Sequence, residues 1–333
     1  MRLSPTSDTP ESGTDVALST VAGGSLERLL VQAEASFRAA RAASTRRAYQ
    51  HDWQQFRRWC ERHALVPLPA APQSVILYAT DLTKNEKRKW NTLQRRLAAL
   101  SQLHQQMGFP SPTRDWAVGQ FLAGLRRELG VAPQRKRPIP AEDLQEILAE
   151  VPDTLLGKRD RALLLLGFTG AFRRSELVAL DAEDLEETRE GLIVRIRRSK
   201  TDQEAEGRSV GIPRGREQAS CAIEALASWR AAAPLESGAL FRVMNRHGHV
   251  LAKRLSAQGI AIVVKRYAEA LGFDPSAFAG HSLRAGLATS AAAAGKSERA
   301  IMQQTGHRSV GTVRRYIREG NLFRENAAEG IGL

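Results

Sequence analysis

Three prolines fall within ten residues of this 333-residue chain, in the segment Val131-Ala-Pro-Gln-Arg-Lys-Arg-Pro-Ile-Pro140. Proline lacks a backbone N–H and disfavours helix in the residue before it, so neither a helix nor a central strand can run through this segment. The chain is also longer than the roughly 250 to 300 residues at which a single hydrophobic core stops growing. We therefore predict two domains joined by an extended linker at residues 131–140.

The residues before the linker predict a helical domain at residues 25–130. Tyr49, Trp53, Phe56 and Cys60 recur along one face of a helix at residues 44–63, with Ser44 placed to cap it. Further helices are expected around residues 75–79, 90–107 and 116–129. The aromatic residues at helical spacing in this part indicate a core rather than platforms for base stacking. Residues 1–24 are rich in Ser, Thr, Pro, Gly and Asp without periodicity, which predicts a flexible arm.

The residues after the linker predict a second domain, residues 141–333, that is mainly helical with a small β-hairpin or sheet, and so of the α+β class. In residues 191–198, Arg195 and Arg197 alternate with Val194 and Ile196, as in a half-buried strand. This strand should pair with residues 208–213. Helices are expected at residues 141–150, 157–170, 175–180, 217–232, 257–271, 282–294, 298–305 and 310–318.

Positive charge is concentrated in the first domain. The chain has a net charge of +13, yet residues 25–137 hold 20 Lys and Arg against 8 Asp and Glu, while residues 138–333 hold 28 against 25. Such a one-sided surface indicates binding to a polyanion through its phosphates. The candidate nucleic-acid contacts are Arg46, Arg47, Lys87, Arg88, Lys89, Arg95, Arg96, Arg135, Lys136 and Arg137.

Other site classes find little support in the sequence. The two cysteines, Cys60 and Cys221, are far apart and have no Cys-x-x-Cys partner, so neither a disulfide framework nor a thiolate metal site is expected. No apolar run approaches the length of a membrane span, and the N-terminus lacks the order of a signal peptide. We therefore expect an intracellular, cytoplasmic protein, nucleoid-associated if the source is a bacterium.

Four segments of the second domain carry polar groups suited to chemistry on a phosphate. Arg173 precedes the sequence Ser175-Glu-Leu177, and Lys200 follows the predicted strand. His281-Ser-Leu-Arg284 places an imidazole and a guanidinium on one side of a helix start. The segment Thr305-Gly-His-Arg-Ser-Val-Gly-Thr-Val-Arg-Arg-Tyr-Ile-Arg318 sets one tyrosine among arginines. Each segment alone is weak evidence for a site.

In this order the set resembles the tyrosine recombinase, or phage integrase, family, over most of the chain from about residue 25. Arg173 stands two residues before Ser-Glu-Leu, as in the family's first arginine box, and Tyr316 follows His307 at the family's nine-residue spacing. The first domain resembles the family's helical core-binding domain. The second, with its C-terminal tail, resembles the catalytic domain.

The resemblance implies a site-specific recombinase that cuts and rejoins DNA strands through a 3′-phosphotyrosine, with no metal and no ATP. Tyr316 would be the nucleophile, and His281 the base that accepts its proton. Arg173, Arg284 and His307 would stabilise the charge that builds on the phosphate oxygens, and Lys200 would protonate the leaving 5′-oxygen. Glu176 would support the first arginine.

The resemblance also implies double-stranded DNA as partner, a homotetramer on two sites and a Holliday junction intermediate, with residues 321–333 docking on a neighbouring subunit. Two alternatives stay open. A type IB topoisomerase also uses a tyrosine with similar helpers and would only relax DNA, and a basic DNA-binding regulator would bind without cutting. One feature departs from the expectation, because the loop beyond Lys200 carries Asp202, Glu204 and Glu206.

Overall fold

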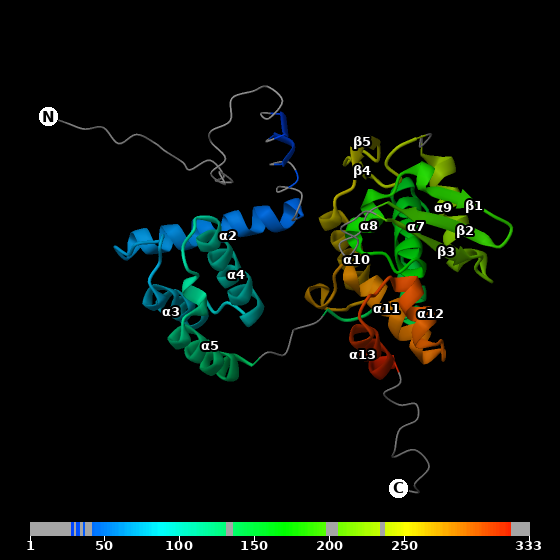
Figure 1. The fold of residues 1–333 in the computed structure, drawn as a ribbon. Coiled ribbons are helices and arrows are strands. Elements are labelled where there is room, and N and C mark those ends of the chain that lie inside the picture. The colour runs from blue at the N-terminus through cyan, green and yellow to red at the C-terminus, as the bar shows by residue number, and fades with distance from the viewer. Residues whose placement is uncertain are drawn as a thin grey trace, which may run out of the picture. The chain divides into compact units, whose positions relative to one another are not determined.

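The chain divides into two compact units, residues 1–133 and 134–333 (Figure 1). The computed structural model describes residues 28, 29, 31–33, 36, 42–130, 136–197, 206–233 and 237–320. The predicted arm at residues 1–24, the tail from residue 321, Arg135 and Lys200 lie outside the described residues. No helix in the described ranges is both long and apolar enough to cross a membrane.

The first unit is helical, as its sequence predicts. Its helices are α2 (Ala43–Arg62), α3 (Pro72–Thr80), α4 (Trp90–Gln106) and α5 (Trp116–Leu129), with the short helices η1 (Asp81–Asn85) and η2 (Pro112–Arg114). The predicted cap was wrong, because Ser44 lies inside α2 and Ala42 occupies the cap position without a side-chain hydrogen bond. The Asp115 carboxylate caps α5 by accepting a hydrogen bond from Ala117 N.

Aromatic side chains form the core of the first unit. Phe56, Trp59 and Tyr78 are buried, and the rings of Phe56 and Tyr78 meet edge to face with centroids 5.0 Å apart. The prediction of core aromatics is confirmed for Phe56, which the sequence placed on the buried stripe. Trp116 is an exception, since it is 78% exposed at the start of α5.

Arg96 corrects one of the predicted nucleic-acid contacts. Its side chain is buried at 8% exposure, and it donates a hydrogen bond of 2.8 Å from Nη1 to Tyr78 Oη. The fully buried carboxylate of Asp52 lies beside Arg96 and accepts a hydrogen bond from Arg95. A cation that balances a buried carboxylate is held inside the fold, so Arg96 stabilises this unit rather than meeting a partner.

The second unit has the predicted α+β class. Its helices are α6 (Ala141–Ala149), α7 (Leu155–Thr169), α8 (Arg174–Ala179), α9 (Ala222–Ala232), α10 (Ala257–Ala270), α11 (His281–Ala293), α12 (Glu298–Thr305) and α13 (Val310–Gly320), with short helices η3 (Ala182–Asp184), η4 (Gln218–Ser220) and η5 (Pro275–Ala277). Strands β1 (Leu185–Glu187), β2 (Gly191–Ile196) and β3 (Arg208–Pro213) form an antiparallel sheet in that order. A second antiparallel pair joins β4 (Arg242–Met244) to β5 (Val250–Arg254).

Helix α7 runs through the centre of this unit and carries the first predicted site segment at its end. The run Ala162–Phe168 is buried on every side, which is why it reads as continuously apolar rather than amphipathic. Helix α9 packs along it, and Leu192, Val194, Val210 and Ile212 of the sheet join the same core. The turn that leads from α7 to Arg173 therefore starts from a fixed point.

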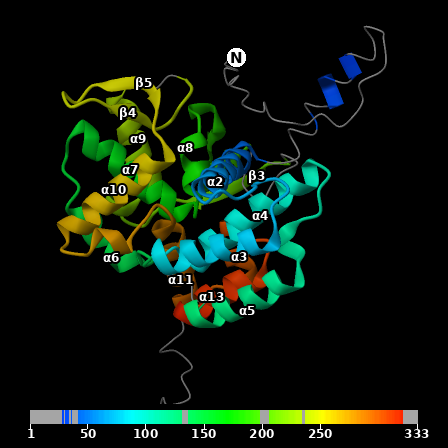
Figure 2. The same cartoon turned by 90° about the vertical axis from the view of Figure 1, so that its left-hand side faces the viewer.

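Helices α11, α12 and α13 pack closely because their contact faces are small. Ala288 and Ala292 of α11 form a core with Ile301 and Val313, and Tyr316 packs against it. Figure 1 and Figure 2 both show α13 beside α11. Alanine on one helix lets the other approach, so the tyrosine hydroxyl of α13 reaches the first turn of α11.

Residues 136–140 pack onto the second unit ahead of α6. Ile139 is buried, and its N–H donates a hydrogen bond of 3.0 Å to Ser282 O at the start of α11. A Cβ on Gly286 would lie 1.7 Å from Ile139 O. The absence of a side chain at Gly286 thus lets this strand-like segment lie directly on the helix that carries His281 and Arg284.

We predict that Gly286→Ala destabilises the second unit by about 1 to 3 kcal/mol, because either residues 136–140 or α11 must shift to admit the methyl group. Urea denaturation of the full chain measures the loss. Gly124→Ala is the matched control, since Gly124 is also helical and a Cβ there meets nothing within 4 Å. The control should be neutral or slightly stabilising. Equal stability of Gly286→Ala and wild type would mean that the close contact is absent in solution.

Candidate active site

Five of the predicted catalytic residues meet in the second unit, from four separate segments. His281 and Arg284 lie in the first turn of α11, Arg173 at the start of α8, His307 between α12 and α13, and Tyr316 on α13. The distance from His281 Nε2 to Tyr316 Oη is 3.0 Å, which is a hydrogen bond, and the rings of His307 and Tyr316 have centroids 5.9 Å apart. Lys200 lies outside the described residues.

Arg284 is the most buried cation of this group, at 1% exposure. Its Nη1 donates a hydrogen bond of 2.7 Å to Ala171 O, while its Nη2 is buried with no hydrogen-bond partner among the described residues. Burial, with the nearby charge of Arg173, lowers the pKa of Arg284 to about 10. A buried guanidinium nitrogen without an acceptor is costly, so this position favours an incoming anion.

A tight turn after α7 supplies the carbonyl that orients Arg284. Ala171 has a φ of +48°, a left-handed conformation that costs a non-glycine residue roughly 1 to 2 kcal/mol. A Cβ on the preceding Gly170 would lie 2.1 Å from the Phe172 ring, which is buried in the core. The packed ring and the missing side chain hold the turn, and with it both Ala171 O and the start of α8.

The Glu176 carboxylate binds both the backbone N–H and the guanidinium of Arg173. The carboxylate is 2% exposed; it accepts a hydrogen bond of 3.0 Å from the backbone N–H of Arg173 and one of 2.5 Å from Arg173 Nη1. Arg173 Nη2 lies 3.4 Å from Gly306 O, a longer contact. The side chain is thus fixed through Nη1, while Nη2 remains weakly held. This is the geometry that a supporting carboxylate provides.

The sequence did not predict Arg208, which joins this cluster from β3. Arg208 Nη2 lies 3.4 Å from Glu176 Oε2, and Nη1 donates a hydrogen bond of 3.2 Å to Gln304 O. A signal for it exists in the sequence. Arg208 alternates with Val210 and Ile212, which are buried, so it stands on the inner face of the strand. A cation on an apolar strand face needs a buried partner.

His307 is held by the end of α12. The helix stops at Gly306, whose φ of +62° is the left-handed conformation that ends many helices. Thr305 Oγ1 donates to Ile301 O at 2.6 Å, so it acts as acceptor toward His307 Nδ1 at 2.7 Å. The proton of neutral His307 therefore lies on Nδ1. To donate from Nε2 as well, the ring must take up a second proton, which a nearby anion favours.

Burial and the surrounding cations favour the neutral form of both histidines. Desolvation and then the charges of Arg284 and Arg173 lower the pKa of His307 to about 3. Desolvation, followed by the same two arginines and Arg174, also lowers the pKa of His281. A neutral His281 can accept the phenol proton of Tyr316 at ordinary pH.

The predicted nucleic-acid contacts of the first unit differ in their surroundings. Three segments carry cations that are exposed, as a contact with a partner requires: Arg46 and Arg47 on α2, Lys87, Arg88 and Lys89 before α4, and Arg95 on α4. Lys136 donates to Ser276 O, and the Arg137 guanidinium lies over the Phe273 ring at 4.5 Å and bonds Asp143. The last two are therefore engaged within the second unit.

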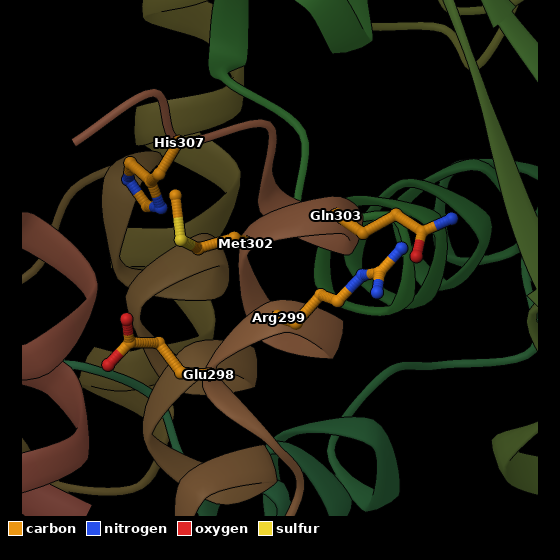
Figure 3. A pocket seen from close by; sticks show the side chains of 5 residues that line it. All are labelled: Glu298, Arg299, Met302, Gln303 and His307. Atoms are coloured by element: carbon orange, nitrogen blue, oxygen red, sulfur yellow. The ribbon is translucent and has the colours of Figure 1, made fainter. Parts of the chain in front are cut away.

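A pocket borders the site without forming part of it. Glu298, Arg299, Met302 and Gln303 of α12 line it together with His307, and Figure 3 shows the Met302 side chain next to the His307 ring. Neither Tyr316, His281 nor the unpartnered nitrogen of Arg284 belongs to its lining. We place the anion beside those groups rather than in this pocket.

A tyrosine hydroxyl bonded to a histidine and flanked by arginines, on this helical fold, defines an enzyme of the tyrosine recombinase class. Residues 137–321 match the Phage integrase family, which covers more than half of the sequence. The chain is 40% identical over 306 residues to an integrase/recombinase XerD homolog of Selenomonas ruminantium, covering 90% of this chain and 89% of the relative. The chain belongs to the phage integrase family.

Further comparisons agree on the fold. Recombinase Cre of Escherichia phage P1 is 28% identical over 287 residues, covering 81% of this chain and 82% of that protein. A lambda integrase dimer bound to a COC′ core site superposes with a TM-score of 0.55 at 15% identity, covering 88% of this chain and 77% of that chain. The XerH recombinase in a post-cleavage complex gives a TM-score of 0.53 at 18% identity, covering 76% and 70%.

The depressed pKa of His307 makes stability depend on pH. The unfolded chain binds the histidine proton near pH 6.5, whereas the folded chain binds it near pH 3, so acid favours unfolding between these values. From pH 7 to pH 5 we expect His307 to reduce the free energy of unfolding by about 1 to 2 kcal/mol. Urea denaturation of wild type and His307→Gln at both pH values measures this difference, since His281 contributes to both proteins. Parallel losses in the two proteins would contradict the assignment.

Proposed function

We propose that this chain is a site-specific DNA recombinase that cuts and rejoins strands through a covalent bond between Tyr316 and a DNA 3′-phosphate. The observation that carries the proposal is the hydrogen bond between Tyr316 Oη and His281 Nε2, beside the unpartnered Nη2 of buried Arg284. Tyr316 and His281 have the geometry of a nucleophile and its base, and Arg284 Nη2 can donate a hydrogen bond to an anion. Among the relatives, XerH and lambda integrase were solved on DNA substrates, which supports DNA as the partner.

In the first step Tyr316 Oη attacks the phosphorus of the scissile phosphodiester and passes its proton to His281 Nε2. The ordinary pKa of a tyrosine is near 10, so a base within hydrogen-bond reach is required at neutral pH. The P–O bond to the 5′-oxygen breaks, and that oxygen takes a proton, which we assign to Lys200 from the family pattern. The product is a 3′-phosphotyrosine and a free 5′-hydroxyl.

Charge that develops on the non-bridging oxygens is stabilised by guanidinium groups already in place. Arg284 offers Nη2, and Arg173 offers Nη2, whose contact with Gly306 O is long at 3.4 Å. Two planar forks suit a phosphate geometrically and remain charged at any relevant pH. Because Ala171 O and Glu176 hold the other nitrogens, little reorganisation is needed when the phosphate arrives.

In the second step a 5′-hydroxyl from another strand attacks the phosphotyrosine. The P–O bond to Tyr316 breaks, the phenolate recovers a proton from His281, and the hydroxyl proton leaves to the Lys200 amine. The covalent intermediate keeps the bond energy, so rejoining needs no external energy source. The same residues would therefore carry out both the cleavage and the rejoining step of strand exchange.

The exposed cations of the first unit would supply affinity for the DNA backbone. Arg46, Arg47, Lys87, Arg88 and Lys89 are open to solvent, and such residues bind phosphates in a salt-dependent manner. Arg95 is exposed although it pairs with Asp52, so we propose it as a further phosphate contact. Arg96 is buried and is not proposed as one. A protein that works on DNA in this way would act in the cytoplasm and, in a bacterium, at the nucleoid.

Recombination joins strands from two duplexes, so we further propose a homotetramer on two sites and a Holliday junction between the two strand exchanges. Membership of the phage integrase family supports this assembly. Residues 321–333, which lie outside the described residues, would dock on a neighbouring subunit. A type IB topoisomerase would need only one copy of the chain on one duplex.

We predict that wild-type protein becomes covalently attached to a nicked suicide DNA that carries its site, because loss of the short nicked strand prevents rejoining. The site itself is found by sequencing genomic DNA fragments that the protein retains. Tyr316→Phe should give no attachment, seen as loss of the slower band on a denaturing gel. Tyr49→Phe is the matched control and should react as wild type does.

Three outcomes would count against the proposal. Attachment by Tyr316→Phe would remove Tyr316 as nucleophile. If the protein relaxes supercoiled DNA but joins no strands between two labelled duplexes, the topoisomerase alternative is favoured. If it retains DNA without covalent attachment, the regulator is favoured.

Lys200→Ala should slow attachment to ordinary DNA by at least about 100-fold, since general acid catalysis contributes roughly 10²- to 10⁴-fold. A substrate with sulfur in place of the leaving 5′-oxygen needs no proton, so its cleavage should be nearly as fast as with wild type. Single-turnover rates on both substrates measure the effect. Equal slowing on both substrates would show that Lys200 is not the acid.

A further inference from the structure

Arg208 contacts three parts of the candidate active site from β3. Its Nη2 shares the Glu176 carboxylate with Arg173, and its Nη1 donates to Gln304 O in the last turn of α12. The guanidinium also occupies the space beside Gly306, where a Cβ would lie 2.9 Å from Arg208 Cζ. This single side chain therefore touches the support of Arg173 and the turn that presents His307.

Gln304 of α12 in turn contacts β3 through its side-chain amide. Its Nε2 donates a hydrogen bond of 3.1 Å to Gly211 O of β3 and one of 2.7 Å to Thr169 O at the end of α7. An amide nitrogen has two hydrogens, and both are used. Arg208 and Gln304 thus tie strand to turn in both directions, and we call this pair the β3–α12 clasp.

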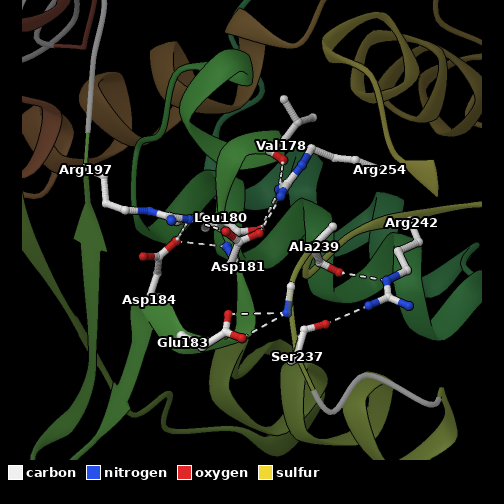
Figure 4. Close-up of polar contacts among 11 residues, drawn as sticks. Val178, Leu180, Asp181, Glu183, Asp184, Arg197, Ser237, Ala239, Arg242 and Arg254 are labelled. Carbon is white, nitrogen blue, oxygen red and sulfur yellow. Dashed lines mark hydrogen bonds and ion pairs between the residues drawn. The ribbon is translucent and has the colours of Figure 1, made fainter. Parts of the chain in front are cut away.

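The position of the clasp along β3 gives it a link to the hairpin. Arg208 pairs with Ile196 at the loop end of the β2–β3 hairpin, next to the segment 198–205 that contains Lys200. On the other limb, Arg197 bonds both Asp181 and Asp184, and Arg254 bonds Asp181 as well (Figure 4). Each limb is thus fixed by an arginine to carboxylates in or after α8.

We propose that Arg208 is a positioning residue for strand cleavage, which couples the β2–β3 hairpin to the His307 turn and shares Glu176 with Arg173. This inference rests on the proposed function, since it assigns Arg208 a part in the same reaction. Arg208 holds Gln304 O and the space beside Gly306, so the turn cannot move without the strand. Because Arg208 Nη2 draws on Glu176 Oε2, it also fixes the carboxylate that orients Arg173.

The charge of Arg208 supports the same role. It is among the cations that lower the pKa of His307 and of Arg284, so it adds to the positive field at the phosphate position. The field at His307 also includes Arg284, Arg173 and His281. Removal of Arg208 would thus alter both geometry and charge, and the test must separate them.

The experiment compares Arg208→Gln, Arg208→Lys and Gln304→Leu with wild type, and Arg195→Gln is the matched control. Arg195 is on the same hairpin but is exposed and paired with Glu186. Two quantities are measured on the nicked suicide DNA, namely the single-turnover rate of attachment at saturating DNA and the dissociation constant of the complex. Hydrogen exchange of the DNA-free protein follows the Gly306 amide, which donates to Met302 O at 2.8 Å.

We expect Arg208→Gln to slow attachment by about 10- to 100-fold with less than about a threefold change in the dissociation constant, because misplacement of a catalytic group by about 1 Å costs that much. Arg208→Lys should be similarly slow, since lysine keeps the charge but lacks the fork that reaches two acceptors. Gln304→Leu should slow attachment to a similar extent. The double variant Arg208→Gln with Gln304→Leu should be no slower than either single variant. Gly306 exchange should accelerate in all three variants and remain unchanged in Arg195→Gln.

Full activity in Arg208→Gln with unchanged exchange at Gly306 would overturn the proposal. So would equal loss of rate and DNA affinity, because Arg208 would then be a DNA contact. A wild-type rate in Arg208→Lys alone would show that charge, not position, is the contribution. The exchange measurement needs no DNA, so failure of wild type to form an adduct would remove the recombinase function and leave the clasp to be judged on exchange.

Discussion

The buried carboxylate of Glu176 holds the cationic site together. It lies under two guanidinium groups, bonds the backbone at the start of α8, and is closed off from solvent. Without that one negative charge, Arg173, Arg208 and Arg284 would lie close together in a poorly solvated place, and their hydrogen-bond acceptors among the described residues would be carbonyl oxygens alone. One carboxylate against three arginines leaves an excess of positive charge, and a phosphodiester brings the charge that would balance it.

This excess is a cost to the free protein and an advantage to the complex. Arg284 has a lowered pKa and an unpartnered nitrogen, His307 is kept neutral, and Ala171 holds a strained backbone. An incoming anion would accept a hydrogen bond from the Arg284 nitrogen and favour protonation of His307, while the strained Ala171 backbone keeps the turn in place. An arrangement of this kind stabilises a charged transition state more than it stabilises the empty fold, which is what catalysis of phosphoryl transfer requires.

The sequence predicted those parts of the fold that repeat a simple period. The helices of the first unit and most of those in the second follow from apolar residues at helical spacing, and the β2–β3 hairpin from alternation around Val194 and Ile196. Strands β1, β4 and β5 were missed because they are short and carry few buried residues, so propensity alone gives no signal. Ser44 was misplaced because α2 begins at Ala43, one residue before the polar side chain that suggested the cap. Arg96 was misplaced because the burial of a cation depends on partners distant in the chain, here Tyr78 and Asp52.

The candidate site divides in the same way. The motif residues could be named from the sequence because the family pattern fixes their order, and the structure brings Arg173, His281, Arg284, His307 and Tyr316 into one place. The contacts that position them could not be named from the sequence. Ala171 O and Gln304 O are backbone carbonyls that any residue supplies, and the Gln304 side-chain amide donates to Thr169 O and Gly211 O, which lie far from it in the chain. Arg208 stands between these cases. Its place on the apolar face of β3 required a buried acceptor, and only the fold shows that this acceptor is the same carboxylate that orients Arg173.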